Sequence, residues 1–351
     1  MKNINIILLA SFCFLCACKE NTNKPKMSFP EETKLSKSEY HIDEDQLAKI
    51  DGIQCNDSSL IIFDAHSGMS YTLFDLTTGK YIGRFGEIGQ GPGEIPLGCI
   101  GQLNNNTYTV HLLSAGFIAQ YCMDSLRTNI KTKPTTSTKI QFQFGDVYFS
   151  KVIPINDTTF MGAGVYNGKY QYILFNNKNQ ILDYSTEVYN AYDKNYNKYH
   201  KMISSEGTLR KSPSKNRFVY SLYYSENIDI LEVSENKINI IKSSRERNPL
   251  LKPTQNGTFV TAHPDLDCPI GYIDIAVGDN NIYSLYTDKN VTNQYCSDII
   301  RVFDWDGNPA KQYKLDQQAY FIAVNEKQNK LYAATKNEDA GWSITAYNLL
   351  P

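Results

Sequence analysis

Short apolar runs that end in an acidic or amide residue recur through most of the chain. The first runs from Tyr71 to Asp75, and it is followed by a polar turn at 76–79 and a second run at 80–85. Runs rich in β-branched and aromatic residues, joined by a short turn of Gly, Asn or Asp, are typical of β-hairpins. The pattern occurs six times, at residues 71–75, 119–124, 172–176, 228–232, 299–304 and 344–348.

A second pattern precedes each of these copies. One residue, apolar in most copies, is followed by a short polar turn and then by another β-rich run, as between Cys55 and Ile62. Two hairpins per unit make a four-stranded antiparallel sheet, and six such units predict an all-β fold, a six-bladed β-propeller. The six members lie at residues 55–62, 103–110, 155–160, 211–220, 277–283 and 324–332.

The spacing of the repeats also bears on the architecture. The acidic or amide residue that ends each apolar run lies 44 residues from the next between Asp304 and Asn348, but 72 residues between Glu232 and Asp304. This uneven spacing fits blades with loop insertions better than a regular solenoid. A two-sheet sandwich would not readily give six paired hairpins in one order. Because the printed sequence stops shortly after the sixth copy, we expect the last blade to have no outer strand from its own repeat. We expect residues 34–42 to supply it and to close the ring, which removes an exposed sheet edge.

The N-terminal segment predicts the cellular location. Lys2 is followed by an apolar run at 6–17, which is shorter than the roughly 20 residues that span a bilayer and is typical of a secretory signal. The run ends in Leu-Cys-Ala-Cys at 15–18, which resembles the lipobox of bacterial lipoproteins. That resemblance implies removal of residues 1–17, lipidation of Cys18 with palmitate-type acyl chains, and anchoring in the outer membrane. The polar residues 18–33 are expected to form a flexible tether, and residues 34–351 to form the propeller.

Composition and charge exclude several classes of function. The 351 residues include 35 Lys and Arg against 37 Asp and Glu, so the net charge of −2 offers no basic surface for nucleic acid. A hydrophobic fraction of 41% is enough for a real core, and 25 Tyr favour strands over helices. Only five His are present, which leaves little material for a His-rich metal cluster.

Two stretches resemble a known family. The glycine-rich sequence at 83–94, and residues 271–276 with 282–286, are similar to the first and fifth blades of TolB-like six-bladed propeller lipoproteins of Bacteroides-type bacteria. The resemblance implies the propeller fold and an outer-membrane, lipid-anchored location, at the cell surface or facing the periplasm. It implies no settled activity and therefore transfers no catalytic residue.

Loop lengths predict which face of the propeller binds. The first and third turns of every blade are short and lie on one face, whereas the long connections, including 183–208 and 243–271, lie on the other. Loops on a rigid scaffold concentrate binding residues, so we expect a protein or glycan partner on the long-loop face. The candidate aromatic residues, which alternatively pack a short helix onto the propeller, are Tyr189, Tyr192, Tyr196 and Tyr199. The candidate charged residues, which alternatively belong to a solvated loop, are Arg245, Arg247 and His263.

Enzymatic chemistry is the alternative function. Metal-dependent hydrolases of the lactonase type also use six-bladed propellers, and they need carboxylates that converge at the channel mouth to hold a cation. Glu94, Asp146 and Asp274 lie in or beside expected inner strands, but no spacing motif supports such a site, and inner-strand carboxylates commonly accept backbone hydrogen bonds. We therefore predict no catalytic residue, metal or cofactor.

The cysteines raise one further hypothesis. Cys268 and Cys296 fall in loops of the same blade on the long-loop face, and the predicted compartment is oxidising. A disulfide between these two cysteines is the resulting prediction.

Overall fold

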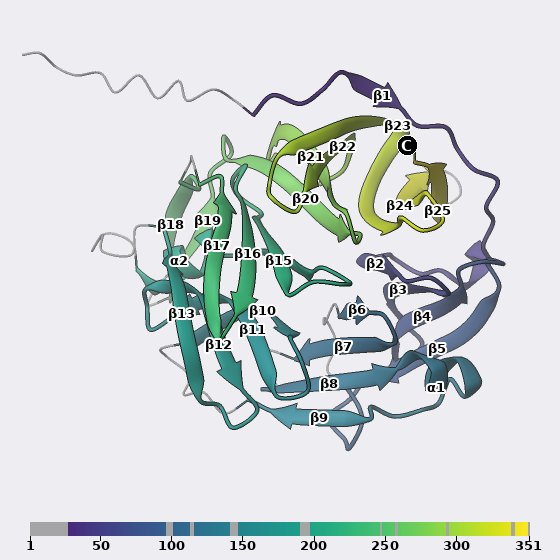
Figure 1. The fold of residues 1–351 in the computed structure, drawn as a ribbon, viewed down its shortest axis with the longest axis horizontal. Coiled ribbons are helices and arrows are strands. Elements are labelled where there is room, and N and C mark those ends of the chain that lie inside the picture. Colours follow the sequence, from purple (N-terminus) through teal and green to yellow (C-terminus); the bar gives the residue numbers. More distant parts are fainter. Residues whose placement is uncertain are drawn as a thin grey trace, which may run out of the picture.

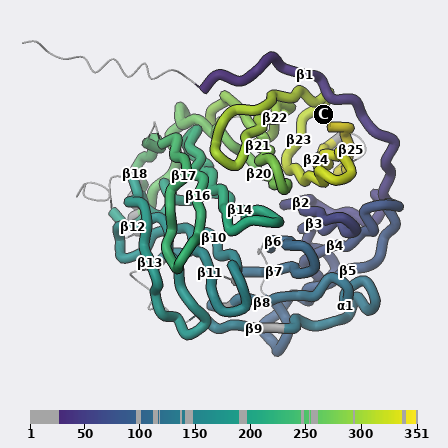
Figure 2. Tube along the Cα trace, in the orientation of Figure 1, coloured from purple at the N-terminus to yellow at the C-terminus, as the bar shows by residue number. Residues whose placement is uncertain are grey.

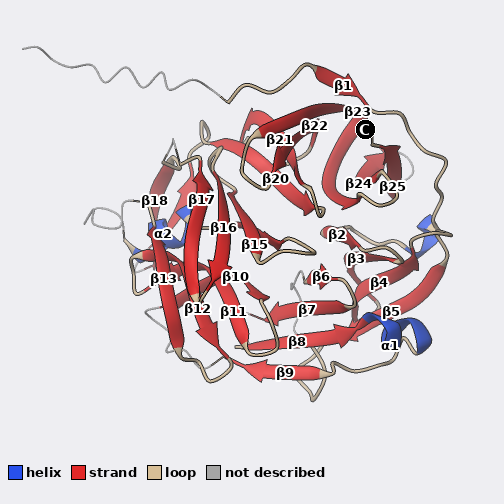
Figure 3. Ribbon diagram, in the orientation of Figure 1, coloured by secondary structure: helices blue, strands red, loops and turns tan. Residues whose placement is uncertain are grey.

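Strands make up most of the described structure, and they are arranged as blades around a central axis. The structure is a computed structural model that describes residues 27–95, 101–112, 116–140, 147–189, 197–245, 248–256, 259–292, 295–337 and 341–349. Figure 1 shows the sheets following one another around the centre in chain order, and Figure 3 shows that the helices of the described residues lie at the periphery. The six-bladed propeller predicted from the repeats is confirmed.

The first four blades are separate four-stranded antiparallel sheets. Blades 1 and 2 consist of β2 (Gly52–Cys55), β3 (Ser59–His66), β4 (Met69–Asp75) and β5 (Tyr81–Glu87), then β6 (Gln102–Asn104), β7 (Thr107–Leu112), β8 (Phe117–Cys122) and β9 (Thr136–Lys139). Blades 3 and 4 consist of β10 (Val147–Pro154), β11 (Thr159–Tyr166), β12 (Tyr170–Asn176) and β13 (Ile181–Glu187), then β14 (Gly207–Lys211), β15 (Arg217–Leu222), β16 (Ile228–Ser234) and β17 (Lys237–Ser243).

Blades 5 and 6 share one long strand. β23 (Pro309–Asn325) begins as the outer strand of blade 5 and continues as the inner strand of blade 6. Its register shifts between Ala319 and Phe321, where it pairs with blade 6, and Figure 2 shows the trace bending sharply along this strand. The other strands of these blades are β20 (Pro269–Val277), β21 (Asn281–Asn290), β22 (Ser297–Asp304), β24 (Lys330–Asn337) and β25 (Gly341–Asn348).

The N-terminal segment lies along the outer edges of these two blades. β1 (Glu32–Lys34) pairs in parallel with β23. The chain then runs antiparallel to β25, where Ser38 N donates to Ala346 O at 2.8 Å and Asn348 N donates to Ser36 O at 3.0 Å. Residues within the predicted 34–42 segment therefore do pair with the last blade. Unexpectedly, contact with the propeller already begins in the stretch assigned to the tether, because Phe29 packs on Phe303 with ring centroids 5.2 Å apart.

Local sequence explains the blades. The first and second strands pair as predicted in all six blades. The third and fourth strands pair as predicted in blades 1 to 5. One turn differs from the expected short form, because the chain after β8 forms the helix α1 (Met123–Thr128), which buries Met123 and Leu126. The other additions are a 3-10 helix η1 (Glu44–Gln46), the helix α2 (Lys198–Ser204) and a hairpin of β18 (Leu251–Asn256) and β19 (Phe259–Pro264) between blades 4 and 5.

The hydrophobic core lies between the blades. Six clusters of buried side chains each join two neighbouring blades, and one of them joins the last blade to the first through residues such as Ala334 and Ile62. Eight Tyr are among the largest fully buried side chains, so a good part of the high Tyr content serves packing. Within the described residues, no helix combines the length and apolarity that a membrane span requires.

Candidate functional site

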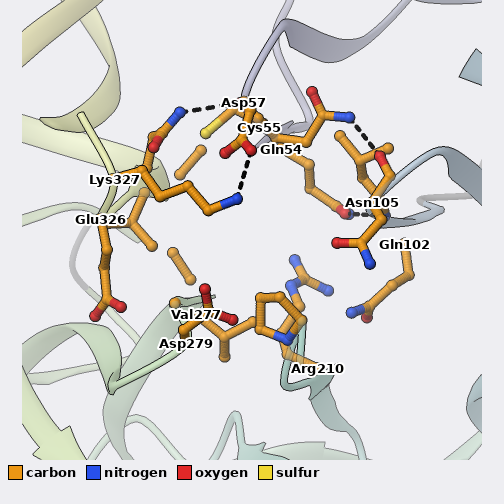
Figure 4. A pocket seen from close by; sticks show the side chains of 18 of the residues that line it. Gln54, Cys55, Asp57, Gln102, Asn105, Arg210, Val277, Asp279, Glu326 and Lys327 are labelled. Carbon is orange, nitrogen blue, oxygen red and sulfur yellow. Dashed lines mark hydrogen bonds and ion pairs between the residues drawn. The ribbon is translucent and has the colours of Figure 1, made fainter. Parts of the chain in front are cut away.

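A cavity of about 620 Å³ lies at one end of the central channel. Its wall is built from the ends of the inner strands and the first turns of blades 1, 2, 4, 5 and 6, as Figure 4 shows. These are the short turns, so the cavity lies on the face opposite the long loops. The loop lengths predicted binding on the long-loop face and did not indicate this cavity.

Hydrogen bonds between blades fix the rim of the cavity. Asn325 Nδ2 of blade 6 donates to Asn56 O of blade 1 at 3.2 Å, and Asn56 Nδ2 donates to Asn105 O of blade 2 at 2.5 Å. Gln54 of blade 1 accepts from Leu103 N of blade 2 at 2.5 Å. The turns of blades 6, 1 and 2 are thus held to one another without a ligand.

Glu326 fixes the neighbouring turn in the same way. Its carboxylate accepts from the backbone N–H groups of Asn280 at 2.9 Å and Asn281 at 3.0 Å. It also accepts from the Tyr283 hydroxyl at 3.1 Å, and burial together with the Glu326 charge raises the pKa of Tyr283. Glu326 is therefore a structural residue that joins blades 5 and 6.

Arg210 lines the cavity, and its guanidinium pairs with the buried Asp274 of the neighbouring blade. Arg210 Nη2 lies 3.4 Å from Asp274 Oδ1, and the two side chains are 11% and 6% exposed. Asp274 Oδ2 accepts from Ile322 N of blade 6 at 3.0 Å. Burial raises the pKa of Asp274, whereas the Arg210 charge and the backbone N–H groups lower it. The pair joins the inner strands of blades 4, 5 and 6.

Several charges of the rim are engaged by other groups of the wall. Lys327 Nζ forms an ion pair with Asp57 at 2.6 Å, and Asn106 Nδ2 donates to Asp124 at 2.7 Å. Lys211 lines the cavity half-buried, and burial lowers its pKa. The cavity therefore carries charges of both signs, most of which are engaged in the wall itself.

Two of the sequence-predicted binding residues come together, but inside the protein. Arg245 lies with its guanidinium carbon 5.2 Å from the centre of the Tyr189 ring, and Tyr189 is only 9% exposed. Arg245 Nε also donates to the buried Asp229 at 2.9 Å, and Tyr172 OH donates to the same carboxylate at 2.5 Å. This cluster fixes the connection between blades 3 and 4.

The two remaining predicted residues that the structure describes, Tyr199 and His263, lie on α2 and β19, which contact each other. Tyr199 lies in the first turn of α2, half-buried, with Lys198 Nζ 5.1 Å above its ring. His263 is exposed on β19, and its Nδ1 lies 3.0 Å from Pro264 O. Other predicted positions lie outside the described residues, namely Cys18, Asp146, Tyr192, Tyr196 and Arg247.

The predicted disulfide is not formed in the structure. Cys268 is a buried thiol that donates to Tyr224 O at 3.4 Å, and burial raises the pKa values of both Cys268 and Cys296. The two cysteines directly precede β20 and β22, which are separated by β21. Strands lie about 4.8 Å apart, so positions two strands apart exceed the roughly 7 Å between Cα atoms that a disulfide can bridge.

Asp274 and Glu94, the two described carboxylates among those considered for a hydrolase, are engaged in structural bonds. Asp274 holds Arg210 and two backbone N–H groups. Glu94 accepts from Gly91 N at 2.7 Å within its own glycine-rich turn. Among the described residues, no three His, Cys, Asp or Glu side chains are grouped so as to hold a metal ion.

Comparison with known proteins identifies the scaffold. The family described as TolB-like 6-blade propeller-like matches residues 33–327. A solved structure from Bacteroides fragilis, described as an exported protein, is 12% identical, with a TM-score of 0.52 over 92% of this chain and 94% of that chain. A member of the DUF4221 family from Bacteroides vulgatus is 9% identical, with a TM-score of 0.49 over 92% of this chain and 97% of that chain. No curated protein matches.

Proposed function

The chain belongs to the TolB-like 6-blade propeller family, and we propose that it is a binding module of the bacterial cell envelope whose ligand site is the cavity on the short-turn face. One observation carries the proposal. The first turns of five blades converge on a cavity of about 620 Å³, and hydrogen bonds between blades hold its rim in place. A preformed concave site with a few converging polar groups is the usual form of a ligand pocket.

The lining indicates a polar ligand. Its side chains are mainly amide, charged and small, and none of the described residues around it is aromatic. The site therefore lacks a flat ring on which a sugar could stack, although the chain holds 25 Tyr. Hydrogen bonds and charge would have to provide the recognition.

The proposed location is the outer membrane, with Cys18 as the lipid-bearing residue. The lipobox at 15–18 supports this location, and so does the description of the Bacteroides fragilis neighbour as exported. The described contacts with the propeller begin near Met27. The nine residues from Cys18 to this contact can therefore separate the lipid anchor from the propeller by at most about 30 Å. Palmitate labelling of the wild type, and its loss in Cys18→Ser, tests the anchor.

A protein partner on the long-loop face is a second candidate interaction. Three large side chains are exposed in the elements around Cys268, with Leu266 at 68%, Leu250 at 50% and Tyr295 at 46%. Large exposed apolar side chains that cluster on a surface often mark an interaction site. Tyr189 and Arg245 do not serve this role, since both are engaged in the blade 3 and 4 cluster.

Photo-crosslinking in intact cells tests which face binds. The photoreactive residue p-benzoylphenylalanine replaces Ser214, which lines the cavity, Leu266 on the long-loop face, or Lys178. Lys178 is the matched control, because it is exposed in a turn of the short-turn face but does not line the cavity. We expect a discrete adduct at Ser214 and none at Lys178.

The three positions separate the outcomes. An adduct at Ser214 that is lost when the cavity is filled by Val277→Trp supports the cavity as the ligand site. Adducts at Leu266 alone would show that the long-loop face is the interaction surface and would refute the cavity. Equal adducts at Ser214 and Lys178 would mean nonspecific capture and would also refute it.

A further inference from the structure

The cavity holds a group of polar atoms that have no partner among the described residues, and these atoms lie mainly on the side formed by blade 4. We propose that this side binds a carboxylate group of the ligand through Lys211 and Arg210, with Gln102 of blade 2 accepting a hydrogen bond from an adjacent N–H or O–H of the same ligand. This inference rests on the proposed function of the cavity and names the chemistry of its ligand.

Lys211 is the first element of the site. It ends β14 at the repeat position where the other blades have Cys55, Leu103, Ile155, Val277 and Val324, so a cation replaces an apolar residue in one blade of six. The ammonium group forms no hydrogen bond or ion pair with the described part of the chain, although Lys211 is half-buried and lines the cavity. A partly desolvated cation without a partner gains from an anion in the cavity.

Arg210 supplies further donors. A guanidinium has five N–H groups, and three are engaged: Nε with Ile275 O at 3.1 Å, Nη1 with Leu209 O at 3.3 Å and Nη2 with Asp274 at 3.4 Å. One N–H on each terminal nitrogen therefore has no partner among the described residues. Figure 4 shows the guanidinium pointing into the cavity. Two donors on neighbouring nitrogens match the two oxygens of a carboxylate.

Gln102 supplies an acceptor opposite these donors. Its side chain points into the cavity in Figure 4, yet the residue is only 5% exposed. Its Nε2 lies 3.3 Å from Asn104 Oδ1, whereas its Oε1 is buried without a hydrogen-bond partner among the described residues. A buried carbonyl oxygen without a donor costs about 1–3 kcal/mol. A ligand that donates an N–H or O–H beside its carboxylate removes that cost.

The other charges of the cavity favour one negative charge on the ligand over two. Its lining has three cationic residues, Arg210, Lys211 and Lys327, and four anionic ones, Asp57, Asp124, Asp279 and Glu326. The Lys327 ammonium is already paired with Asp57. A dianionic phosphate would meet net repulsion from this lining, whereas a carboxylate next to Lys211 and Arg210 adds a single charge.

Ligand-observed NMR titration of the purified full-length protein tests the proposal. The probes are N-acetyl-alanyl-alanine, its C-terminal amide, glucuronate, glucose and inorganic phosphate. We expect the free acid to bind at least tenfold more tightly than the amide, or glucuronate to bind at least tenfold more tightly than glucose. The first result identifies the carboxylate of a peptide chain end, and the second that of a uronic acid. Tighter binding of phosphate than of both acids would overturn the proposal.

Matched variants locate the binding. Lys211→Ala should weaken binding of the preferred acid about tenfold, as expected for a charge-assisted hydrogen bond, whereas Lys211→Arg should retain most of it. Lys215→Ala is the control, because Lys215 is exposed in the same turn but does not line the cavity. Unchanged binding in Lys211→Ala, with the thermal midpoint preserved, would overturn the proposal. Adducts at Ser214 together with equal binding of the acid and amide probes would refute only the carboxylate, and the cavity would remain the ligand site.

Discussion

Replacing Arg210 with Met removes the cation that joins blade 4 to blade 5 beside the cavity. The wild-type pair is buried, with Arg210 Nη2 3.4 Å from Asp274 Oδ1. The substitution retains most of the aliphatic volume but leaves the Asp274 carboxylate buried without its counter-ion. It also removes the donors to the carbonyl groups of Ile275 and Leu209.

The expected loss is about 3 kcal/mol in the free energy of unfolding at pH 8. Coulomb's law with an effective dielectric constant of 20 gives about 5 kcal/mol for unit charges at this separation. The guanidinium loses hydration on burial, which offsets part of that energy, and breaking a buried pair is typically worth about 3–5 kcal/mol. We expect the lower end because Asp274 keeps two backbone donors, Ile275 N and Ile322 N.

The loss in the free energy of unfolding caused by Arg210→Met should become smaller as the pH falls. Burial raises the pKa of Asp274 in the wild type, and removal of the Arg210 charge, which lowers it, raises this pKa further. A carboxyl whose pKa is higher in the folded state stabilises the fold at low pH, and that contribution is lost as the pH rises through the folded-state value. The difference between Arg210→Met and wild type is therefore smaller at pH 5 than at pH 8.

Urea unfolding at pH 5 and pH 8 measures both effects. Lys314→Met is the control, because its ion pair with Asp298 is partly exposed and should contribute under about 1 kcal/mol. Adding Asp274→Asn to Arg210→Met should recover at least about 1 kcal/mol at pH 8, since it removes the unpaired buried charge. A loss below 1 kcal/mol, or one that does not change with pH, would refute the role assigned to this pair.

Two further predictions concern pH and the N-terminal segment. Burial lowers the pKa of His111 to about 3. The unfolded chain therefore takes up this proton at a higher pH than the folded protein, and the free energy of unfolding decreases as the pH falls below about 6.5. Between pH 8 and pH 5 the decrease is about 2 kcal/mol. Urea midpoints at both pH values should show that His111→Leu reduces this loss, and an equal loss in the variant would contradict the assignment. Ser38→Pro removes the N–H that donates to Ala346 O and should cost about 1–2 kcal/mol. In the same unfolding assay Ser36→Pro should lower the free energy of unfolding less than Ser38→Pro does, because Ser36 contributes its carbonyl group and not its N–H to this pairing. A larger loss in Ser36→Pro than in Ser38→Pro would contradict the register.

The blades could be predicted because each hairpin is specified locally. Turn residues such as Asn56 and Asp75 accept hydrogen bonds from the backbone of their own turns. The alternation of apolar residues then sets which side chains enter the clusters between blades. The helix α1 was missed because the burial of Met123 and Leu126 depends on the neighbouring blade, which a short window of sequence does not show.

The cavity could not be predicted from loop length. Its wall comes from turns that are far apart in the sequence, such as those after Cys55 and Val277, and only the complete ring brings them together. Tyr189 and Arg245, the long-loop residues predicted to bind a partner, are buried beside Asp229. An aromatic ring and a guanidinium also interact favourably with each other inside a protein. One signal was present in the repeat itself, the cation Lys211 at a position that is apolar in the other five blades.

A crystal structure of the protein purified in mild detergent from its own bacterial envelope would test the ligand site most directly. We predict electron density for a bound group in the cavity, with oxygen atoms within about 3 Å of Lys211 Nζ and the Arg210 guanidinium. A cavity that holds only water, together with ligand density on the long-loop face near Leu266, would contradict the account.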